Sequence, residues 1–192
     1  MPAFPEVEVA QPKTNWLSPE VQRRAFEGVP EDDKPIIAFL MLSGCRPGEA
    51  RALKCKDVDL ENGIITVSAT FSNEIYREKR KGKKAKSVVI PIHPEMFAYL
   101  KNRVENNLPS AFVFINSRTG QRYYEKKLRR IWKAVKEKIE LNYGIRLYDA
   151  TRHSFASQLV NSGVPLLSVS RLLGHSSIKM TERYAHSVIY KS

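Results

Sequence analysis

The apolar run PIIAFLMLSG, residues 35–44, constrains the fold of this chain more than any other feature. Its uninterrupted apolar part, IIAFLML, is too short to cross a bilayer as a helix. A glycine directly after such a run is typical of a helix end, because glycine readily adopts the left-handed conformation. The run therefore predicts a buried helix that ends at Gly44.

Further helices are predicted on both sides of this run. Ser18 followed by proline and glutamate is typical of a capped helix start. Residues 123–140 place apolar side chains at helical spacing, with basic residues elsewhere. Glycines end two more predicted helices, at Gly163 and Gly174. The remaining predicted helices cover residues 46–58, 149–163, 165–174 and 176–188.

Two segments rich in β-branched residues predict strands. GIITVSATFS at 63–72 and SVVIPI at 87–92 flank the polar run NEIYREKRKGKKAK, which indicates a hairpin with a long basic tip. AFVFIN at 111–116 is a third short strand or an extended segment. The predicted fold class is therefore mainly α with a small antiparallel β-sheet (α+β).

Composition limits the cellular setting and the partners. The chain has 192 residues and a formal net charge of +12, so polyanions will be attracted to it, nucleic acid first and an anionic membrane surface second. Its two cysteines, Cys45 and Cys55, have no CxxC spacing, which argues against a zinc site or a disulfide framework. We expect a reduced, cytoplasmic protein, with an extended arm or linker remnant at 1–16 and one domain at 17–192.

Three cationic side chains lie at predicted helix starts, where the helix dipole favours anions instead. Arg46 precedes one helix, Arg152 lies in the first turn of the helix opened by Asp149, and His175 precedes the last helix. A shared anion explains all three, because guanidinium groups, imidazole and helix N–H groups all bind phosphate oxygens. Taken singly, each is better explained as a surface ion pair or a cap, and Tyr184 as a half-buried core residue.

The three segments that carry these residues resemble, in order and spacing, the signature blocks of the tyrosine recombinases, also called phage integrases. They read SGCRPGEARALKCKDVDL, DATRHSFASQLVNSGV and LLGHSSIKMTERYAHS. The most specific feature is a Leu-Gly-His block whose histidine precedes a tyrosine by nine positions. The resemblance extends from about Leu17 to His186.

The resemblance implies a role for each residue. Arg46 and Arg152 correspond to the two catalytic arginines, Glu49 to the acidic residue beside the first arginine, His175 to the later histidine and Tyr184 to the nucleophile. The family cleaves a DNA strand with the tyrosine hydroxyl, forms a 3′-phosphotyrosine link and reseals the strand without metal or ATP, so no cofactor is expected. Two bidentate guanidinium groups suit the charge that develops on the phosphate.

The family protonates the leaving 5′-oxygen with a lysine on a β-hairpin. The KGKKAK pattern favours Lys81 for this role, whereas counting back from Pro91 favours Lys83. The other basic residues of the run are predicted to contact the DNA backbone. They are Arg77, Lys79, Arg80, Lys84 and Lys86.

One position departs from the family pattern. Asp149 stands where the family usually has histidine, three residues before the second arginine. This leaves the proton acceptor for Tyr184 open. Our hypothesis is that Asp149 is mainly a helix cap, with Tyr148 or water accepting the proton. His153 and His186 are interpreted as supporting residues.

The resemblance also implies partners: double-stranded DNA, other protomers in a tetrameric synapse, and no membrane. A close alternative is a type IB topoisomerase, which uses the same tyrosine chemistry. A DNA-binding module without catalysis would explain the charge alone. Binding to an acidic membrane is weakly supported, since no helix near a terminus pairs a broad apolar face with a uniformly basic one.

Overall fold

The computed structural model describes residues 15–78, 87–141 and 144–185. It is mainly helical, with a three-stranded and a two-stranded antiparallel sheet, so the predicted fold class is confirmed. The α-helices are α1 (Pro19–Glu27), α2 (Lys34–Ser43), α3 (Pro47–Ala52), α4 (Pro94–Glu105), α5 (Glu125–Lys138), α6 (Ser154–Asn161), α7 (Leu166–Leu173) and α8 (Lys179–Ala185). Short 3-10 turns lie at η1 (Glu31–Asp33) and η2 (Cys55–Asp57), and a π-helical turn lies at η3 (Asp149–His153).

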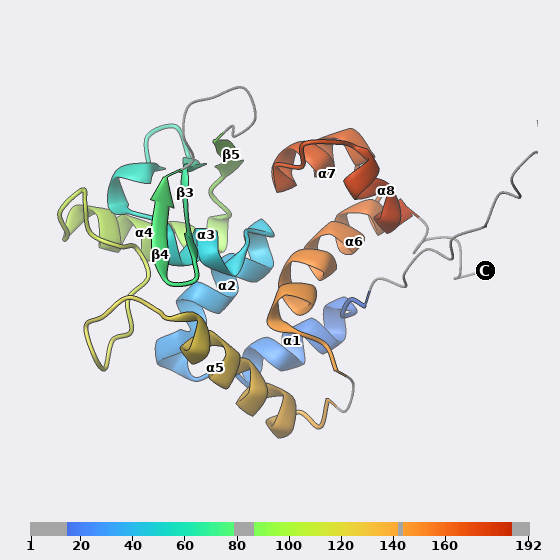
Figure 1. Ribbon diagram of the computed structural model, residues 1–192, viewed down its shortest axis with the longest axis horizontal. Coiled ribbons are helices and arrows are strands. Elements are labelled where there is room, and N and C mark those ends of the chain that lie inside the picture. Colours follow the sequence, from blue (N-terminus) through green and yellow to red (C-terminus); the bar gives the residue numbers. More distant parts are fainter. Residues whose placement is uncertain (1–14, 79–86, 142–143, 186–192) are drawn as a thin grey trace, which may run out of the picture.

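Helix α2 is buried at the centre of the molecule, as predicted (Figure 1). Ile36, Ile37 and Leu40 are fully buried in the main core, which also takes side chains from α1, α4, α5 and the three-stranded sheet. Gly44 ends α2 in the left-handed conformation, with φ of 63°. A Cβ there would lie 2.4 Å from the ring of Phe155, so this glycine allows α2 and α6 to approach closely.

The predicted basic hairpin is confirmed only in part: residues 64–67 pair antiparallel with 88–91, whereas 69–72 pair with 75–78 of the predicted polar tip. Residues 63–72 form two strands, β2 (Ile64–Val67) and β3 (Ala69–Ser72), which belong to different sheets. Strand β2 lies between β1 (Val58–Asp59) and β5 (Val88–Pro91), with Ile65 opposite Ile90. Strand β3 pairs instead with β4 (Ile75–Glu78), which arises from the predicted polar tip. Asn73 and Glu74, both with positive φ, form the tight turn that the sequence interpretation missed.

Other expectations are met to different degrees. Ser18 caps α1 through its hydroxyl, and α5 buries Leu128 and Val135, as predicted. Helix α3 ends at Ala52, earlier than expected, because the chain then becomes extended and Lys54 bridges to Phe112. Residues 111–116 form an extended segment with isolated bridges and no full strand. Helix α4 was not predicted.

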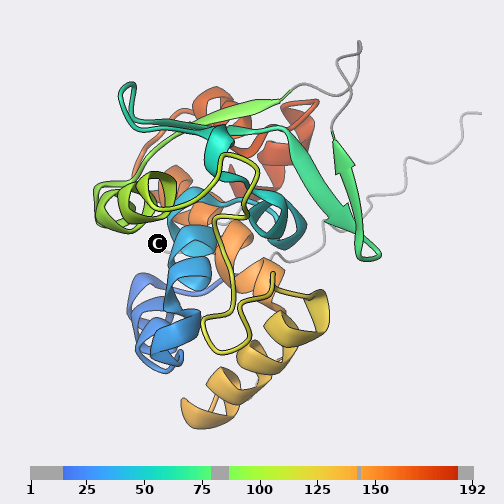
Figure 2. The ribbon, with the colours of Figure 1, turned by 90° about the vertical axis from the view of Figure 1, so that its left-hand side faces the viewer.

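The three C-terminal helices form a smaller layer beside the main core (Figures 1 and 2). Its buried residues are Ala156, Val169, Leu173 and Tyr184, in a hydrophobic cluster separate from the main one. Gly174 ends α7 with φ of 62° and packs on Val88 of β5, where a Cβ would lie 2.2 Å from the valine side chain. This contact fixes the end of α7 against the sheet.

The transition into α6 is a π-helical turn. The N–H of Ser154 donates to the carbonyl of Asp149, five residues earlier, instead of the usual four. Residues 149–153 are all buried, and together with α6 they contact α2. Within the described residues, no helix has both the length and the apolar character that a bilayer crossing requires.

Candidate active site

Arg46 lies at the start of α3 and is held by Glu49 of the same helix. The Glu49 carboxylate accepts hydrogen bonds from the Arg46 backbone N–H at 3.0 Å and from its guanidinium at 3.2 Å. Glu49 is buried, whereas 38% of the Arg46 side chain is exposed. Glu49 therefore orients a guanidinium group that solvent, or a ligand, can still reach.

Arg152 is almost completely buried, with 1% exposure. Its two terminal nitrogens donate to the carbonyls of Gly44 at 2.8 Å and Leu173 at 2.7 Å. These carbonyls end α2 and α7, where unpaired C=O groups carry partial negative charge. Its Nε is buried without a hydrogen-bond partner among the described residues. Arg152 thus ties the main core to the C-terminal layer and retains an unused donor.

His175 directly follows the left-handed Gly174. Its Nδ1 lies 2.8 Å from the hydroxyl of Thr181, and its Nε2 is buried without a hydrogen-bond partner among the described residues. Burial, and after it the positive charges of Arg152 and Arg46, lowers the pKa of His175 to about 4. The imidazole is therefore neutral at pH 7. If Nδ1 accepts the threonine proton, Nε2 carries an N–H that can be donated.

Tyr184 is fully buried in α8, and its hydroxyl lies 2.6 Å from Nδ1 of His153. Burial raises the pKa of Tyr184, and the nearby guanidinium of Arg183 opposes that increase. The Arg183 guanidinium carbon lies 5.2 Å from the centre of the tyrosine ring. The sequence interpretation placed Tyr184 correctly on the last helix but did not anticipate His153 as its partner.

Asp149 is the position at which the chain departs from the family pattern. Its carboxylate accepts from the backbone N–H of Arg146 at 3.3 Å and from the Arg146 guanidinium at 2.8 and 3.0 Å. Helical structure already begins at Leu147, so Asp149 lies inside the first turn and is not the N-cap that the sequence predicted. Its carboxylate accepts a backbone N–H from three residues earlier, as the acidic member of a capping box does. The same carboxylate also lies 3.4 Å from Nε2 of His153, a contact that the capping hypothesis did not include.

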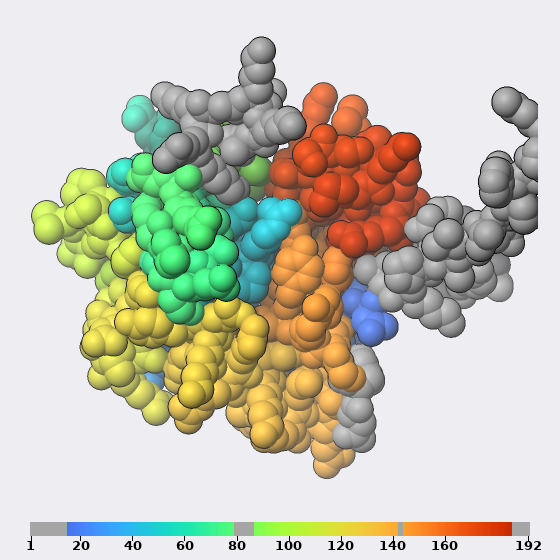
Figure 3. Space-filling view, viewed as in Figure 1, coloured from blue at the N-terminus to red at the C-terminus, as the bar shows by residue number. Residues whose placement is uncertain are grey.

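The fold brings the predicted residues within electrostatic range of one another. The charge of Arg46 and the hydroxyl of Tyr184 both influence the pKa of Arg152, after burial, which lowers it most. The pKa of His175 responds to both arginines and to His153. The face drawn in Figure 3 shows the helices next to these groups: α3 in cyan, which follows Arg46, α6 in orange, which follows Arg152, and α7 and α8 in red, which flank His175. The predicted hairpin residues Lys79, Arg80, Lys81, Lys83, Lys84 and Lys86, and also His186, lie outside the described residues.

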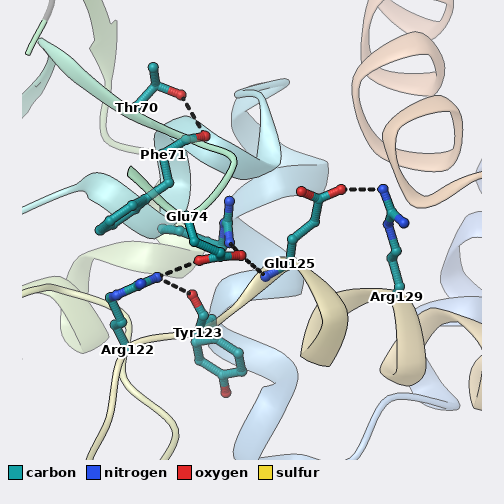
Figure 4. Close-up of polar contacts among 8 residues, drawn as sticks. Thr70, Phe71, Glu74, Arg122, Tyr123, Glu125 and Arg129 are labelled. Carbon is teal, nitrogen blue, oxygen red and sulfur yellow. Dashed lines mark hydrogen bonds and ion pairs between the residues drawn. The ribbon is translucent and has the colours of Figure 1, made fainter. Parts of the chain in front are cut away.

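A second polar cluster holds the β3–β4 hairpin against the site. Glu74 accepts hydrogen bonds from Arg51 of α3 at 2.6 Å, from Arg122 at 2.7 Å and from the backbone N–H of Glu125 at 2.8 Å (Figure 4). Burial alone would raise the pKa of Glu74, but these three donors lower it to about 2. The hairpin turn is thereby fixed to the helix that begins at Arg46. Arg77, predicted to contact DNA, is exposed on β4.

A basic groove of about 700 Å³ runs beside these elements. It is lined by the first turn of α3, by one face of α5 and by residues 144–148. Three of its positive side chains, Arg129, Lys133 and Lys136, were seen in the sequence only as the basic face of a helix. The other two, Arg51 and Arg146, were not singled out.

Comparisons with known proteins identify the family. The profile of the phage integrase family matches residues 17–189, so the chain belongs to the phage integrase family. This family is the tyrosine recombinase class that the three sequence blocks resemble, and the resemblance is confirmed.

Individual relatives support the same class. The chain is 29% identical to tyrosine recombinase XerA of Pyrococcus furiosus, over 94% of this chain and 59% of that protein. It is 31% identical to tyrosine recombinase XerA of Thermococcus kodakarensis, over 94% of this chain and 60% of that protein. The chain thus spans about 60% of the length of these relatives.

Solved structures share the fold. A crystal structure of XerA recombinase superposes with a TM-score of 0.71 at 23% identity, covering 96% of this chain and 64% of that one. The integrase of transposon Tn1549, in complex with circular intermediate DNA, superposes with a TM-score of 0.72 at 21% identity, covering 88% of this chain and 61% of that one.

Proposed function

We propose that this chain is the catalytic domain, residues 17–192, of a site-specific DNA recombinase that cuts and rejoins strands through a 3′-phosphotyrosine. One observation carries the proposal. The fold brings together four residues that are distant in the sequence, Arg46, Arg152, His175 and Tyr184. Arg46 and Tyr184 both affect the pKa of Arg152, and the two arginines both affect the pKa of His175. Donors on Arg152 and His175 are buried without partners among the described residues, as a phosphate site requires.

The two arginines supply the electrostatic part of the reaction. Attack on a phosphodiester places additional negative charge on its non-bridging oxygens. Arg46 is partly exposed and oriented by Glu49, while Arg152 is fixed by two helix-end carbonyls. Both guanidinium groups are held before the substrate arrives, so little reorganisation is needed in the transition state. A neutral His175 adds a hydrogen-bond donor through Nε2.

The bond changes are balanced. The Tyr184 oxygen forms a bond to phosphorus and loses its proton, while the bond from phosphorus to the 5′-oxygen breaks. That oxygen takes a proton from a lysine, for which Lys81 is the first candidate and Lys83 the second. The phosphotyrosine ester stores the energy of the cleaved bond, so a 5′-hydroxyl can displace Tyr184 without ATP.

The basic groove supports DNA as the substrate. Lys133 and Lys136 project from α5 into it, and Arg129 lines it one turn earlier. With a net charge of +12, the chain has the cations to neutralise several phosphates without reading bases. The named structural relative from Tn1549 is bound to DNA, which supports the same partner for this chain. We further propose assembly with other protomers as a tetramer on DNA, in the cytoplasm.

A covalent-adduct assay tests the proposal. The protein is incubated with a nicked duplex from which the cleaved end diffuses away, and protein–DNA adducts are separated under denaturing conditions. Wild type is expected to form an adduct, and Tyr184→Phe to form none while binding the duplex equally well. Tyr99→Phe is the matched control, because Tyr99 lies on α4, which contributes none of the site residues, and its hydroxyl donates to the Val113 carbonyl.

The assay also separates the alternatives. Equal DNA binding by wild type and Tyr184→Phe, with no adduct from either, would contradict catalysis and leave a DNA-binding module. Relaxation of any supercoiled plasmid without a specific site would point to a topoisomerase. The relatives named above are called recombinases and integrases, which does not favour that alternative.

A further inference from the structure

We propose that His153 is the catalytic base that accepts the Tyr184 proton, and that Asp149 is the positioning residue that holds its imidazole. This inference rests on the proposed function, and it fills the role that the departure at Asp149 leaves open. It also changes our interpretation of His153 from a supporting residue to one that touches the reacting oxygen.

The contact between the two residues is direct. The Tyr184 hydroxyl lies 2.6 Å from Nδ1 of His153, which is within the range of a short hydrogen bond. Both side chains are buried, His153 at 7% exposure and Tyr184 at 0%. The described contacts of Asp149 reach the tyrosine only through His153. Of these two candidate bases, His153 is the one that lies against the proton to be removed.

The contacts of the imidazole select the tautomer that can accept. Nε2 faces the Asp149 carboxylate at 3.4 Å, which favours a proton on Nε2. Nδ1 then has a free lone pair, and the tyrosine hydroxyl donates to it. As Tyr184 attacks, its proton moves to Nδ1, and the resulting imidazolium lies beside the Asp149 anion. The proton returns to Tyr184 when a 5′-hydroxyl reseals the strand.

The surrounding charges couple this base to DNA binding. Burial, and after it the charges of Arg183 and the other nearby arginines, lowers the pKa of His153 to about 4, although the Asp149 carboxylate opposes this decrease. A phosphate bound at Arg152 and Arg46 would offset part of that positive charge and make His153 a stronger base. The charged or titratable groups that face the imidazole are Asp149, Arg146, Tyr148, Arg152, His175, Arg183 and Tyr184.

The backbone of residues 149–153 explains how Arg152 and His153, which are adjacent in the sequence, contact different helices. Arg152 donates toward the ends of α2 and α7, while His153 faces α8. Both lie in the π-helical turn, whose wider hydrogen-bond ring changes side-chain directions relative to an α-helix. Asp149 and His153, four residues apart, remain on the same side.

The decisive variant is His153→Asn, whose amide oxygen can replace Nδ1 as a hydrogen-bond acceptor but cannot take up a proton. We expect adduct formation to slow by about 100-fold or more while DNA affinity is unchanged. The wild-type rate should fall at low pH as His153 becomes protonated, and this acidic limb should be absent from the variant. His93→Asn is the matched control, because His93 is an exposed cap of α4.

A sulfur-substituted substrate distinguishes loss of the base that activates Tyr184 from loss of the acid that protonates the leaving group. When sulfur replaces the leaving 5′-oxygen, departure needs no proton, so a lysine variant should recover and His153→Asn should remain slow. Asp149→Asn supplies a second test, since removal of the anion should shift the acidic limb to lower pH. A merely structural role would leave that limb in place.

The outcomes are distinct. An active wild type whose His153→Asn variant has the same rate and pH profile would overturn this inference and leave the proposed function intact. Recovery of His153→Asn on the sulfur substrate would also overturn it, by assigning His153 to the leaving group. Should His153→Asn fail to fold, as judged by circular dichroism, an unshifted Asp149→Asn profile overturns it instead. Absence of any wild-type adduct would overturn the proposed function and this inference together.

Discussion

The main core and the α6–α8 cluster hold different parts of the proposed reaction. Arg46 and Glu49 belong to a helix that packs on the large core, together with α2 and the sheets. Among the described residues, Tyr184 shares a small cluster with three other buried hydrophobic residues. Because local stability follows buried apolar contact, the phosphate-binding half should be rigid and the nucleophile half easier to open. Arg152 joins them by donating to one carbonyl from each side.

The difference in stability between the two halves is tested most directly by shortening one buried leucine in each. Leu40→Ala in the main core is expected to lower the free energy of unfolding by about 2–5 kcal/mol, measured in urea. Leu173→Ala in the small cluster should act first on local opening, so that amide exchange in α7 and α8 accelerates while α2 remains protected. Equal loss of protection in both layers after Leu173→Ala would contradict the contrast.

Acid should destabilise the nucleophile half before the rest. His153 and His175 both have a pKa of about 4 when folded, against 6.5 ordinarily, so the unfolded chain binds more protons between these values. The free energy of unfolding should therefore fall as pH decreases from about 6.5 to 4, by at most about 1.4 kcal/mol per pH unit for each histidine. Urea titrations at several pH values measure this slope. His153→Asn should reduce it, and an unchanged slope would contradict the assignment.

The smallest expected change in stability comes from Glu74, which holds the β3–β4 hairpin to α3. Glu74→Gln should lower the free energy of unfolding by about 1 kcal/mol at pH 7, because Glu74 is partly exposed and its ion pairs are screened. Its folded pKa of about 2 places the stabilisation above pH 4.5 and removes it as pH falls toward 2. Thermal unfolding at both pH values measures the difference. Glu105→Gln, in an exposed pair on α4, should change neither value.

Local signals allowed much of the fold to be predicted. The buried helix α2, the capped start of α1 and the ends at Gly44 and Gly174 follow from patterns within a few residues of each position. Helix α4 begins with a similar signal, a proline followed by a glutamate, and it was overlooked. The β3–β4 turn was missed because Glu74 adopts a positive φ and is held there by Arg51 and Arg122, which are distant in sequence.

In the site, too, local patterns allowed prediction and contacts between distant residues did not. The positions of Arg46, Arg152, His175 and Tyr184 follow from recognisable blocks, although their catalytic roles remain predictions. The pairing of His153 with Tyr184 spans 31 positions and depends on a π-helical turn, for which the sequence has no local signature. The basic face of α5 was visible as a charge pattern, but only the packing of α3 beside it makes that face a groove.

The π-helical turn at Asp149–His153 has a consequence for any redesign of this chain. The turn takes up one more residue than an ordinary helical turn does, between the start of the helix and its continuation in α6. Deleting one residue there would restore the ordinary four-residue hydrogen-bond spacing, and the four residues that remain could not supply all of the positions that Asp149, Arg152 and His153 now occupy. The length of this segment therefore matters as well as the identity of its residues.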